Sequence, residues 1–203
     1  MNSKKNFIWN FLGLSINSFN SLFFLIIVNR VNGGTDGGIF TYAYSLVCLT
    51  YFIGLFFNRP YQIANPNKYS NKEFIVNRLI SIILMFIVSL SLTFIFEYDS
   101  YKTGVIMLIC LYRMLEAGSD ILYGIEQSHD ELYKSGISMF FKGIIGLVLF
   151  FVVDYITNNL LLSILALVII NIVGIIFYDI PNSKKYIDNK YKFINVLNIY
   201  KVT

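Results

Sequence analysis

The chain has 203 residues, of which 56% are hydrophobic and only 14% are charged, and its mean hydropathy is +0.63. Soluble domains carry about 25% charged residues, so this composition excludes an ordinary soluble protein and predicts a chain embedded in a lipid bilayer. The formal net charge of +4 comes from basic residues in short segments between apolar runs. That distribution is typical of membrane proteins and argues against a nucleic-acid partner.

Six apolar stretches are long enough to cross the hydrocarbon core as helices, which takes about 20 residues each. Turn-rich or charged segments separate them, beginning with the glycine-rich segment 32–38, and Pro181 predicts a stop after the last stretch. No strand-like alternation persists. We therefore expect an all-α polytopic membrane protein, with a six-span lobe in residues 1–180 and a polar tail in residues 181–203. The predicted spans are residues 7–29, 39–57, 74–96, 103–125, 136–153 and 160–178.

The basic residues predict the orientation of the spans. With a cytoplasmic N-terminus, thirteen of the 16 Lys and Arg lie on the inner side, Arg30 and Lys102 lie outside, and Arg113 lies within a span. This positive-inside bias places both termini in the cytoplasm. Basic, polar and apolar residues alternate in the tail after Lys184, which suits either a helix on an anionic membrane surface or a linker toward a further segment.

The fourth predicted span carries the clearest group of polar residues, Arg113, Glu116, Asp120, Tyr123 and Gln127. At 100° per residue they lie within about 80° of one another on one helical face. An ion pair between Arg113 and Glu116 would explain two of them, but it leaves Asp120 without a partner on its own helix, which favours a polar cavity. The opposite face is compatible with lipid and carries Leu111, Leu115, Leu122 and Ile125.

The first span repeats this pattern more weakly. Asn10, Asn17 and Asn20 form a stripe with Gly13 and Ser21. Amides in membrane helices often serve as hydrogen-bonding links between helices. A whole stripe of small and polar residues favours the lining of a water-filled route.

Arg59 and Lys142 have two interpretations each. Arg59 follows the second span, where it can anchor the helix at an anionic surface or hold a phosphate; composition alone favours the anchor. Lys142 can extend to the interface or face the cavity. Asn171 is isolated in the sixth span, which favours a link between helices.

Catalytic signatures are missing from the sequence. There is no phosphate-binding G-x-x-x-x-G-K-[ST] motif, and the only histidine, His129, lies in a predicted loop. Cys48 and Cys110 each fall inside an apolar run, which predicts packing residues rather than a metal site or a disulfide. We expect neither an enzyme nor a bound cofactor or metal.

The order of short motifs along the chain resembles the Wzx-type oligosaccharide flippases of the multidrug/oligosaccharidyl-lipid/polysaccharide exporter superfamily. Each motif alone is degenerate, but together they extend over all six predicted spans. The motifs are Trp9-Asn10, Ser18-Phe-Asn-Ser-Leu22, Val28-Asn-Arg-Val-Asn-Gly33, Gly38-Ile-Phe-Thr-Tyr-Ala-Tyr-Ser45, Arg59-Pro-Tyr-Gln62, the run from Arg113 to Gln127, and Tyr178-Asp-Ile-Pro181.

This resemblance implies two six-helix lobes around a central cavity in the bacterial cytoplasmic membrane. It implies that undecaprenyl-pyrophosphate-linked oligosaccharides are moved to the outer leaflet by alternating access. Glu116 or Asp120 would couple this movement to protons or cations. The expected substrate-binding residues are Arg59 and Arg113 for the pyrophosphate and Asn10, Asn17, Asn20, Tyr123 and Gln127 for the sugars.

Members of that family are about twice as long as this chain, which corresponds to their N-terminal lobe. The resemblance therefore leaves open a fragment or truncated product that lacks its C-terminal half, and a half-transporter that pairs with a second copy. The main alternative is a non-transporting half-flippase or membrane partner protein, in which the polar faces only join helices. A multidrug exporter of the same superfamily comes next, and a membrane enzyme last.

Overall fold

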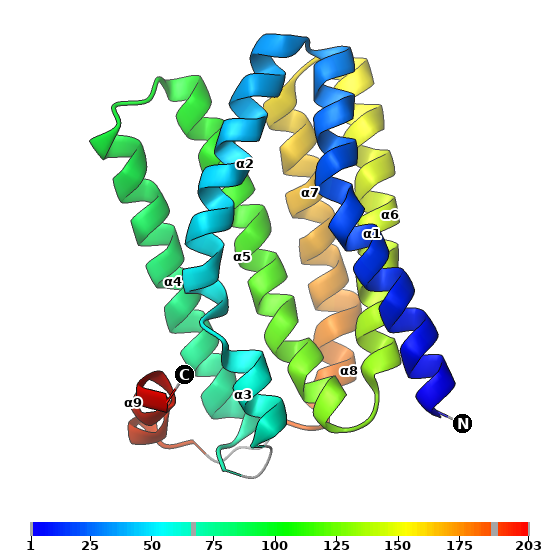
Figure 1. Ribbon diagram of the computed structural model, residues 1–203, viewed down its shortest axis with the longest axis vertical. Coiled ribbons are helices and arrows are strands. Elements are labelled where there is room, and N and C mark those ends of the chain that lie inside the picture. The colour runs from blue at the N-terminus through cyan, green and yellow to red at the C-terminus, as the bar shows by residue number, and fades with distance from the viewer. Residues whose placement is uncertain (1, 66–67, 188–190, 203) are drawn as a thin grey trace.

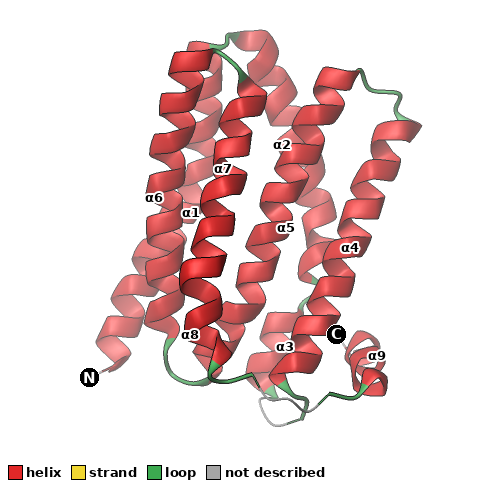
Figure 2. Cartoon of the chain, turned by 180° about the vertical axis from the view of Figure 1, so that it is seen from behind, coloured by secondary structure: helices red, strands yellow, loops and turns green. Residues whose placement is uncertain are grey.

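The computed structural model describes residues 2–65, 68–187 and 191–202. Within these residues six long helices run side by side, and short helices follow the second and sixth of them (Figure 1). The described residues contain helices and turns and no strand, as Figure 2 shows. The elements are α1 (Asn2–Val31), α2 (Gly34–Leu55), α3 (Asn58–Ala64), α4 (Asn71–Ile95), α5 (Ser100–Ser128), α6 (Leu132–Thr157), α7 (Leu160–Gly174), the π-helix η1 (Ile175–Asp179), α8 (Ile180–Lys184) and α9 (Phe193–Val202).

Five helical segments are long and apolar enough to cross a membrane, which is compatible with the predicted polytopic membrane protein. They are Ser3–Val31, Gly34–Ala64, Asn71–Ile95, Leu132–Thr157 and Leu160–Lys184. The predicted fourth span, 103–125, lies within α5, which is long enough but is not among the five.

The central position of α5 explains its polar composition. It contacts α2, α3, α4, α6, α7 and α8 and lies between the other long helices in Figure 1. The expectation that its Leu122 and Ile125 face lipid is wrong, because these side chains are 7% and 0% exposed. They pack with Phe74 of α4 and Ile199 of α9. A helix enclosed in this way can carry charge without placing it against hydrocarbon.

Two helix boundaries differ from the sequence prediction. The glycine-rich segment 32–38 is mostly helical, because α2 begins at Gly34 and only Asn32 and Gly33 form the turn. Gly33 has a φ of 88°, which glycine adopts without steric cost, and Asp36 in the first turn favours the positive end of the helix dipole.

Pro181 does not end the last long helix, which continues from η1 through α8 to Lys184. Pro181 lies at the junction of η1 and α8, where the hydrogen bonding of the helix is already irregular. The helix therefore crosses the predicted boundary between residues 180 and 181.

The tail folds back onto the bundle. Val196 and Ile199 of α9 are fully buried, and the Tyr200 hydroxyl donates to the backbone oxygen of Asn77 in α4 at 2.8 Å. Residues 188–190 and 203 of the predicted tail lie outside the described residues. Of the two alternatives for the tail, a helix is present in residues 193–202, and it packs against α4.

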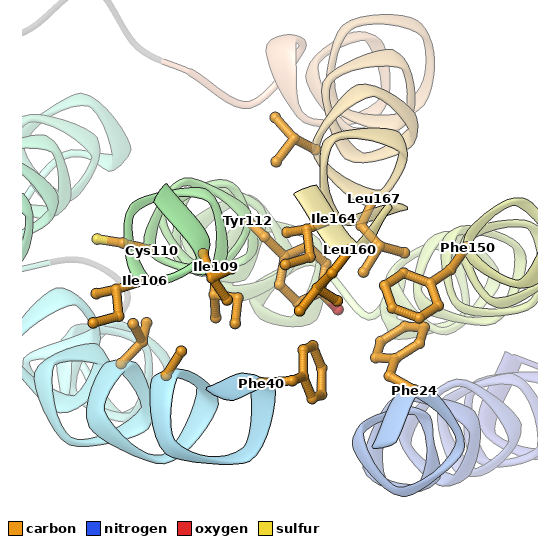
Figure 3. Packing of buried hydrophobic residues seen from close by; sticks show 14 of the residues in the cluster. Phe24, Phe40, Ile106, Ile109, Cys110, Tyr112, Phe150, Leu160, Ile164 and Leu167 are labelled. Atoms are coloured by element: carbon orange, nitrogen blue, oxygen red, sulfur yellow. The ribbon is translucent and has the colours of Figure 1, made fainter. Parts of the chain in front are cut away.

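The contacts between helices divide the bundle into two groups. One contains α1, α6 and α7, and the other contains α2, α3, α4, α5 and α9, while α5 and α7 are the main contact between the groups. An apolar core fills the end of the bundle near the α1–α2 turn, where Phe24, Phe40 and Phe150 meet from three helices (Figure 3). The ring centroids of Phe24 and Phe150 are 4.8 Å apart.

Glycines bring α1 and α6 into backbone contact. A Cβ atom on Gly13 would lie 2.5 Å from the backbone oxygen of Gly136, and a Cβ on Gly136 would meet the backbone of Trp9 and Asn10. Small residues at such a crossing let membrane helices approach closely.

We predict that Gly136→Ala destabilises the protein by about 1–3 kcal/mol, because the added methyl group meets backbone that cannot rotate away. Gly118→Ala on α5 is the matched control, since its Cβ would have nothing within 4 Å. It should be neutral or stabilising by up to about 1 kcal/mol. Thermal unfolding of the purified protein in detergent measures both. Equal melting temperatures for the two variants would contradict the close contact.

A charged cluster joins the α5–α6 turn to the end of α8. The Nζ atoms of Lys134 and Lys185 lie 2.6 and 3.1 Å from the carboxylate oxygens of Glu131. Partial burial alone would raise the pKa of the Glu131 carboxyl, but the lysine hydrogen bonds outweigh it and lower this pKa from 4.5 to about 2.

Because this pKa is lower in the folded state, the contribution of Glu131 to stability is present above about pH 4.5 and is lost as the pH falls toward 2. We predict that Glu131→Gln flattens this part of the curve of melting temperature against pH. Identical curves for the variant and the parent chain would show that the cluster does not stabilise the fold.

Candidate functional site

A polar cavity of about 140 Å³ lies between the two helix groups, directly below the apolar core. The apolar core and the cavity lining share three residues, Phe24, Tyr112 and Leu167. The core therefore closes the cavity toward the α1–α2 turn. On the α1 side Leu14 and Asn17 are exposed, which leaves this rim open. The lining residues are Leu14, Asn17, Asn20, Phe24, Tyr51, Arg59, Tyr112, Glu116, Ser119, Asp120, Tyr123, Met139, Lys142, Gly143, Gly146, Leu167 and Asn171.

Most of the residues singled out from the sequence meet in this cavity. Those that line it are Asn17, Asn20, Arg59, Glu116, Asp120 and Tyr123. Gln127 lies just behind Arg59, and Arg113 lies behind Glu116. Asn10 is placed at the α1–α6 crossing beside Gly136 and not in the cavity lining. The position of Asn10 thus favours a packing role.

Asp120 is the centre of the first charged cluster. Its two carboxylate oxygens accept hydrogen bonds from Arg59 Nη1 and Arg78 Nη2, each at 2.9 Å. The second guanidinium nitrogen of Arg59 donates to Gln127 Oε1 at 2.8 Å. Asp120 therefore finds on α3 and α4 the partners that its own helix does not supply.

The turn between α2 and α3 directs Arg59 toward α5. Phe56 and Phe57 have φ values of 36° and 44°, which bulky residues adopt rarely. These two left-handed residues end α2 and restart the chain as α3, which contacts α5. Strained backbone of this kind often occurs at functional sites.

The second cluster is the ion pair considered from the sequence. Arg113 Nη1 lies 2.5 Å from Glu116 Oε2, and Arg113 also donates to the hydroxyl of Tyr44 on α2. The Tyr112 hydroxyl donates to Glu116 Oε1 at 2.9 Å. The two charges are thus paired within the protein, and Arg113 also links α5 to α2, although its buried Nε has no hydrogen-bond partner among the described residues.

The third cluster surrounds Asp179, which sequence reasoning missed. This fully buried carboxylate accepts hydrogen bonds from Lys142 Nζ and Ser119 Oγ, both at 2.8 Å, and from Ser138 Oγ at 2.5 Å. The π-helix η1 ends at Asp179, and such insertions into helices frequently mark functional sites. Lys142 therefore points inward to an ion pair rather than to the membrane interface.

Arg78 was also missed as a site residue, although it lies one or two turns inside its predicted span. The sequence pattern placed it only among the basic residues on the cytoplasmic side of the membrane. Its side chain is 1% exposed, and a charge buried to this degree requires a partner. The position of Arg78 inside a predicted membrane span was the signal that could have identified it. Its partner Asp120 on α5 could not be predicted, because their contact depends on how the helices pack.

The arrangement suits a strongly polar, uncharged or anionic guest. Its charged groups are Arg59, Arg78, Arg113 and Lys142 against Glu116, Asp120 and Asp179, which leaves one excess positive charge. Among the described residues no three His, Cys, Asp or Glu side chains form a group that could hold a metal ion. The amides of Asn17 and Asn20 and the hydroxyl of Tyr123 add hydrogen-bonding capacity.

Over 199 residues the chain is 27% identical to the capsular polysaccharide biosynthesis protein CapF of Staphylococcus aureus. The match covers 97% of this chain and 49% of CapF, so the chain spans about half the length of the curated relative it matches. No protein family model matches the chain, and no solved structure is significantly similar to it.

We predict that Lys142→Met destabilises the protein by about 3–5 kcal/mol, because it leaves the Asp179 carboxylate buried without a cation. The double variant Lys142→Met/Asp179→Asn should recover at least about 2 kcal/mol relative to the sum of the two single changes. Denaturant unfolding in detergent micelles measures this cycle. Simple additivity would contradict a functional ion pair between the two residues.

Proposed function

We propose that this chain is one lobe of a membrane transporter that serves polysaccharide biosynthesis and flips undecaprenyl-pyrophosphate-linked oligosaccharides across the bacterial cytoplasmic membrane. The observation that carries the proposal is the charged cavity inside a bundle with an apolar exterior. Charges at membrane depth are costly and by default mark a pathway for a polar substrate. The similarity to CapF supports the polysaccharide context.

Different residues of the cavity would bind the sugar and the pyrophosphate of this substrate. Asn17, Asn20 and Tyr123 offer amides and a hydroxyl to sugar hydroxyl groups. Arg59 offers a guanidinium to the pyrophosphate, which such a group binds with two parallel hydrogen bonds. Gln127 keeps Arg59 in place through its 2.8 Å hydrogen bond.

Binding of the pyrophosphate can also supply the coupling to ions. When phosphate oxygens replace Asp120 as the partner of Arg59, Asp120 keeps Arg78 on one carboxylate oxygen, and the other oxygen can take up a proton or a cation. Glu116 would release its charge in the same way only after Arg113 moved. Transport that is indifferent to pH, sodium and membrane potential would contradict this step.

The transport unit requires a second lobe. In alternating access one lobe moves against the other around a central site, and the open α1 rim at Asn17 is the side that a second lobe would complete. A second copy or a separate polypeptide can fill this place. Six spans, α5 included, would put both termini on the same side of the membrane, which the basic residues assign to the cytoplasm. In Figure 1 both ends of the described chain lie toward the same end of the bundle.

We predict that the chain restores surface polysaccharide in a capsule-forming cell that lacks its own flippase when it is co-expressed with the half of CapF that it does not match. Restoration by the chain alone would show that a second copy is sufficient. No restoration in either case, with stable membrane-inserted protein, would contradict transport and favour a non-transporting membrane partner.

Neighbouring residues on α1 provide the matched controls. Asn17→Leu removes a lining amide and should reduce restoration at least about tenfold. Ser18→Leu makes an equally apolar change at an exposed residue outside the lining and should leave restoration unchanged. Equal effects of the two changes would exclude a specific role for the cavity.

A further inference from the structure

An apolar groove of about 300 Å³ opens on the opposite side of the Asp120 cluster, between α2, α3 and α4. These helices lie next to one another in both views of the chain (Figures 1 and 2). Phe52 and Phe57 at the rim are 65% and 70% exposed, so the groove opens onto the apolar outer face of the bundle. Its apolar walls are Phe52, Leu55, Phe57, Pro60 and Ile63.

The inner end of this groove is charged. Arg59, Arg78 and Asp120 line it, and two guanidinium groups share this one carboxylate. Arg78 also donates to the backbone oxygen of Gly54 at 2.7 Å, but its buried Nε has no hydrogen-bond partner among the described residues. The cluster thus has one excess positive charge and one unused donor.

Arg59 and Asp120 line both the groove and the polar cavity. Their ion pair is therefore the wall between a space suited to sugars and a space suited to a hydrocarbon chain. Only a molecule with a polar head, an anionic junction and an apolar chain would match the two spaces and the wall together.

We infer that the groove binds a lipid phosphate, with its single hydrocarbon chain between α2, α3 and α4 and its phosphate on Arg59 and Arg78. The inference rests on the proposed function, in which this lipid is the carrier end of the saccharide. It places the hydrocarbon chain of the lipid within this lobe, at the α2–α4 face, instead of at the boundary with a second lobe.

The chemistry of the groove separates this occupant from others. A free phosphate would gain nothing from five apolar walls, and an uncharged lipid would leave the excess positive charge and the Arg78 Nε unmatched. A two-chain phospholipid would have to fit two chains into a space of about 300 Å³.

Native mass spectrometry of the full chain in detergent tests the inference with a polyprenyl phosphate as the probe. We expect saturable binding that is at least about tenfold tighter than that of the corresponding polyprenol. Displacement of the probe by an equal concentration of inorganic phosphate or of phosphatidylglycerol would overturn the assignment. Equal binding of the polyprenol would also overturn it.

Two leucines on α2 give a matched pair for the groove. Leu55→Trp fills it and should weaken binding of the probe at least about tenfold, whereas Leu49→Trp changes an exposed leucine outside the groove and should have no effect. Equal binding to the two variants would overturn the inference. Melting temperatures confirm that both variants are folded.

The probe carries no sugar and the assay requires no transport, so failure of lipid binding can be distinguished from failure of transport. Loss of restoration in cells with intact lipid binding would contradict the transporter and leave the groove assignment standing. Asn17→Leu, which changes only the cavity, should leave binding of the probe unchanged.

Discussion

Burial of charge along α5 is the constraint on which the arrangement of the other helices depends. Arg113, Glu116 and Asp120 of this helix each meet an opposite charge, because hydrocarbon offers no solvation. Asp120 draws α3 and α4 toward α5 through two arginines. Arg113 and Glu116 neutralise one another, and the hydroxyl of Tyr44 connects this pair to α2.

The same requirement explains why polar and apolar spaces adjoin one another. A carboxylate shared by two guanidinium groups forms a thin polar wall, since neither arginine can leave it without losing its partner. The cavity and the groove lie on the two sides of this wall. The charges that hold the bundle together are therefore also the ones that a phosphate would contact.

The all-helical class and the approximate positions of the long helices could be predicted from the sequence, because apolar length and polar breaks are local properties, although five and not six helices qualify as candidate spans. The helix boundaries were predicted less well at Gly34 and Pro181, two residue types that usually interrupt helices. Here α2 begins at Gly34, and the last long helix continues past Pro181. The polar face of α5 was also readable from its spacing. Its partners were not, since Arg78 and Asp179 approach α5 only through packing between helices that lie far apart in the chain.

The division of the bundle into two helix groups limits how the cavity can change shape. The chain passes from one group to the other at the α1–α2 turn and passes back at the α5–α6 turn at the opposite end of the bundle (Figure 1), before it crosses again between α8 and α9. The first two connections are short, at residues 32–33 and 129–131. Two short connections at opposite ends of the bundle leave the groups free to rotate about the line that joins the turns, but they prevent one group from sliding along the other.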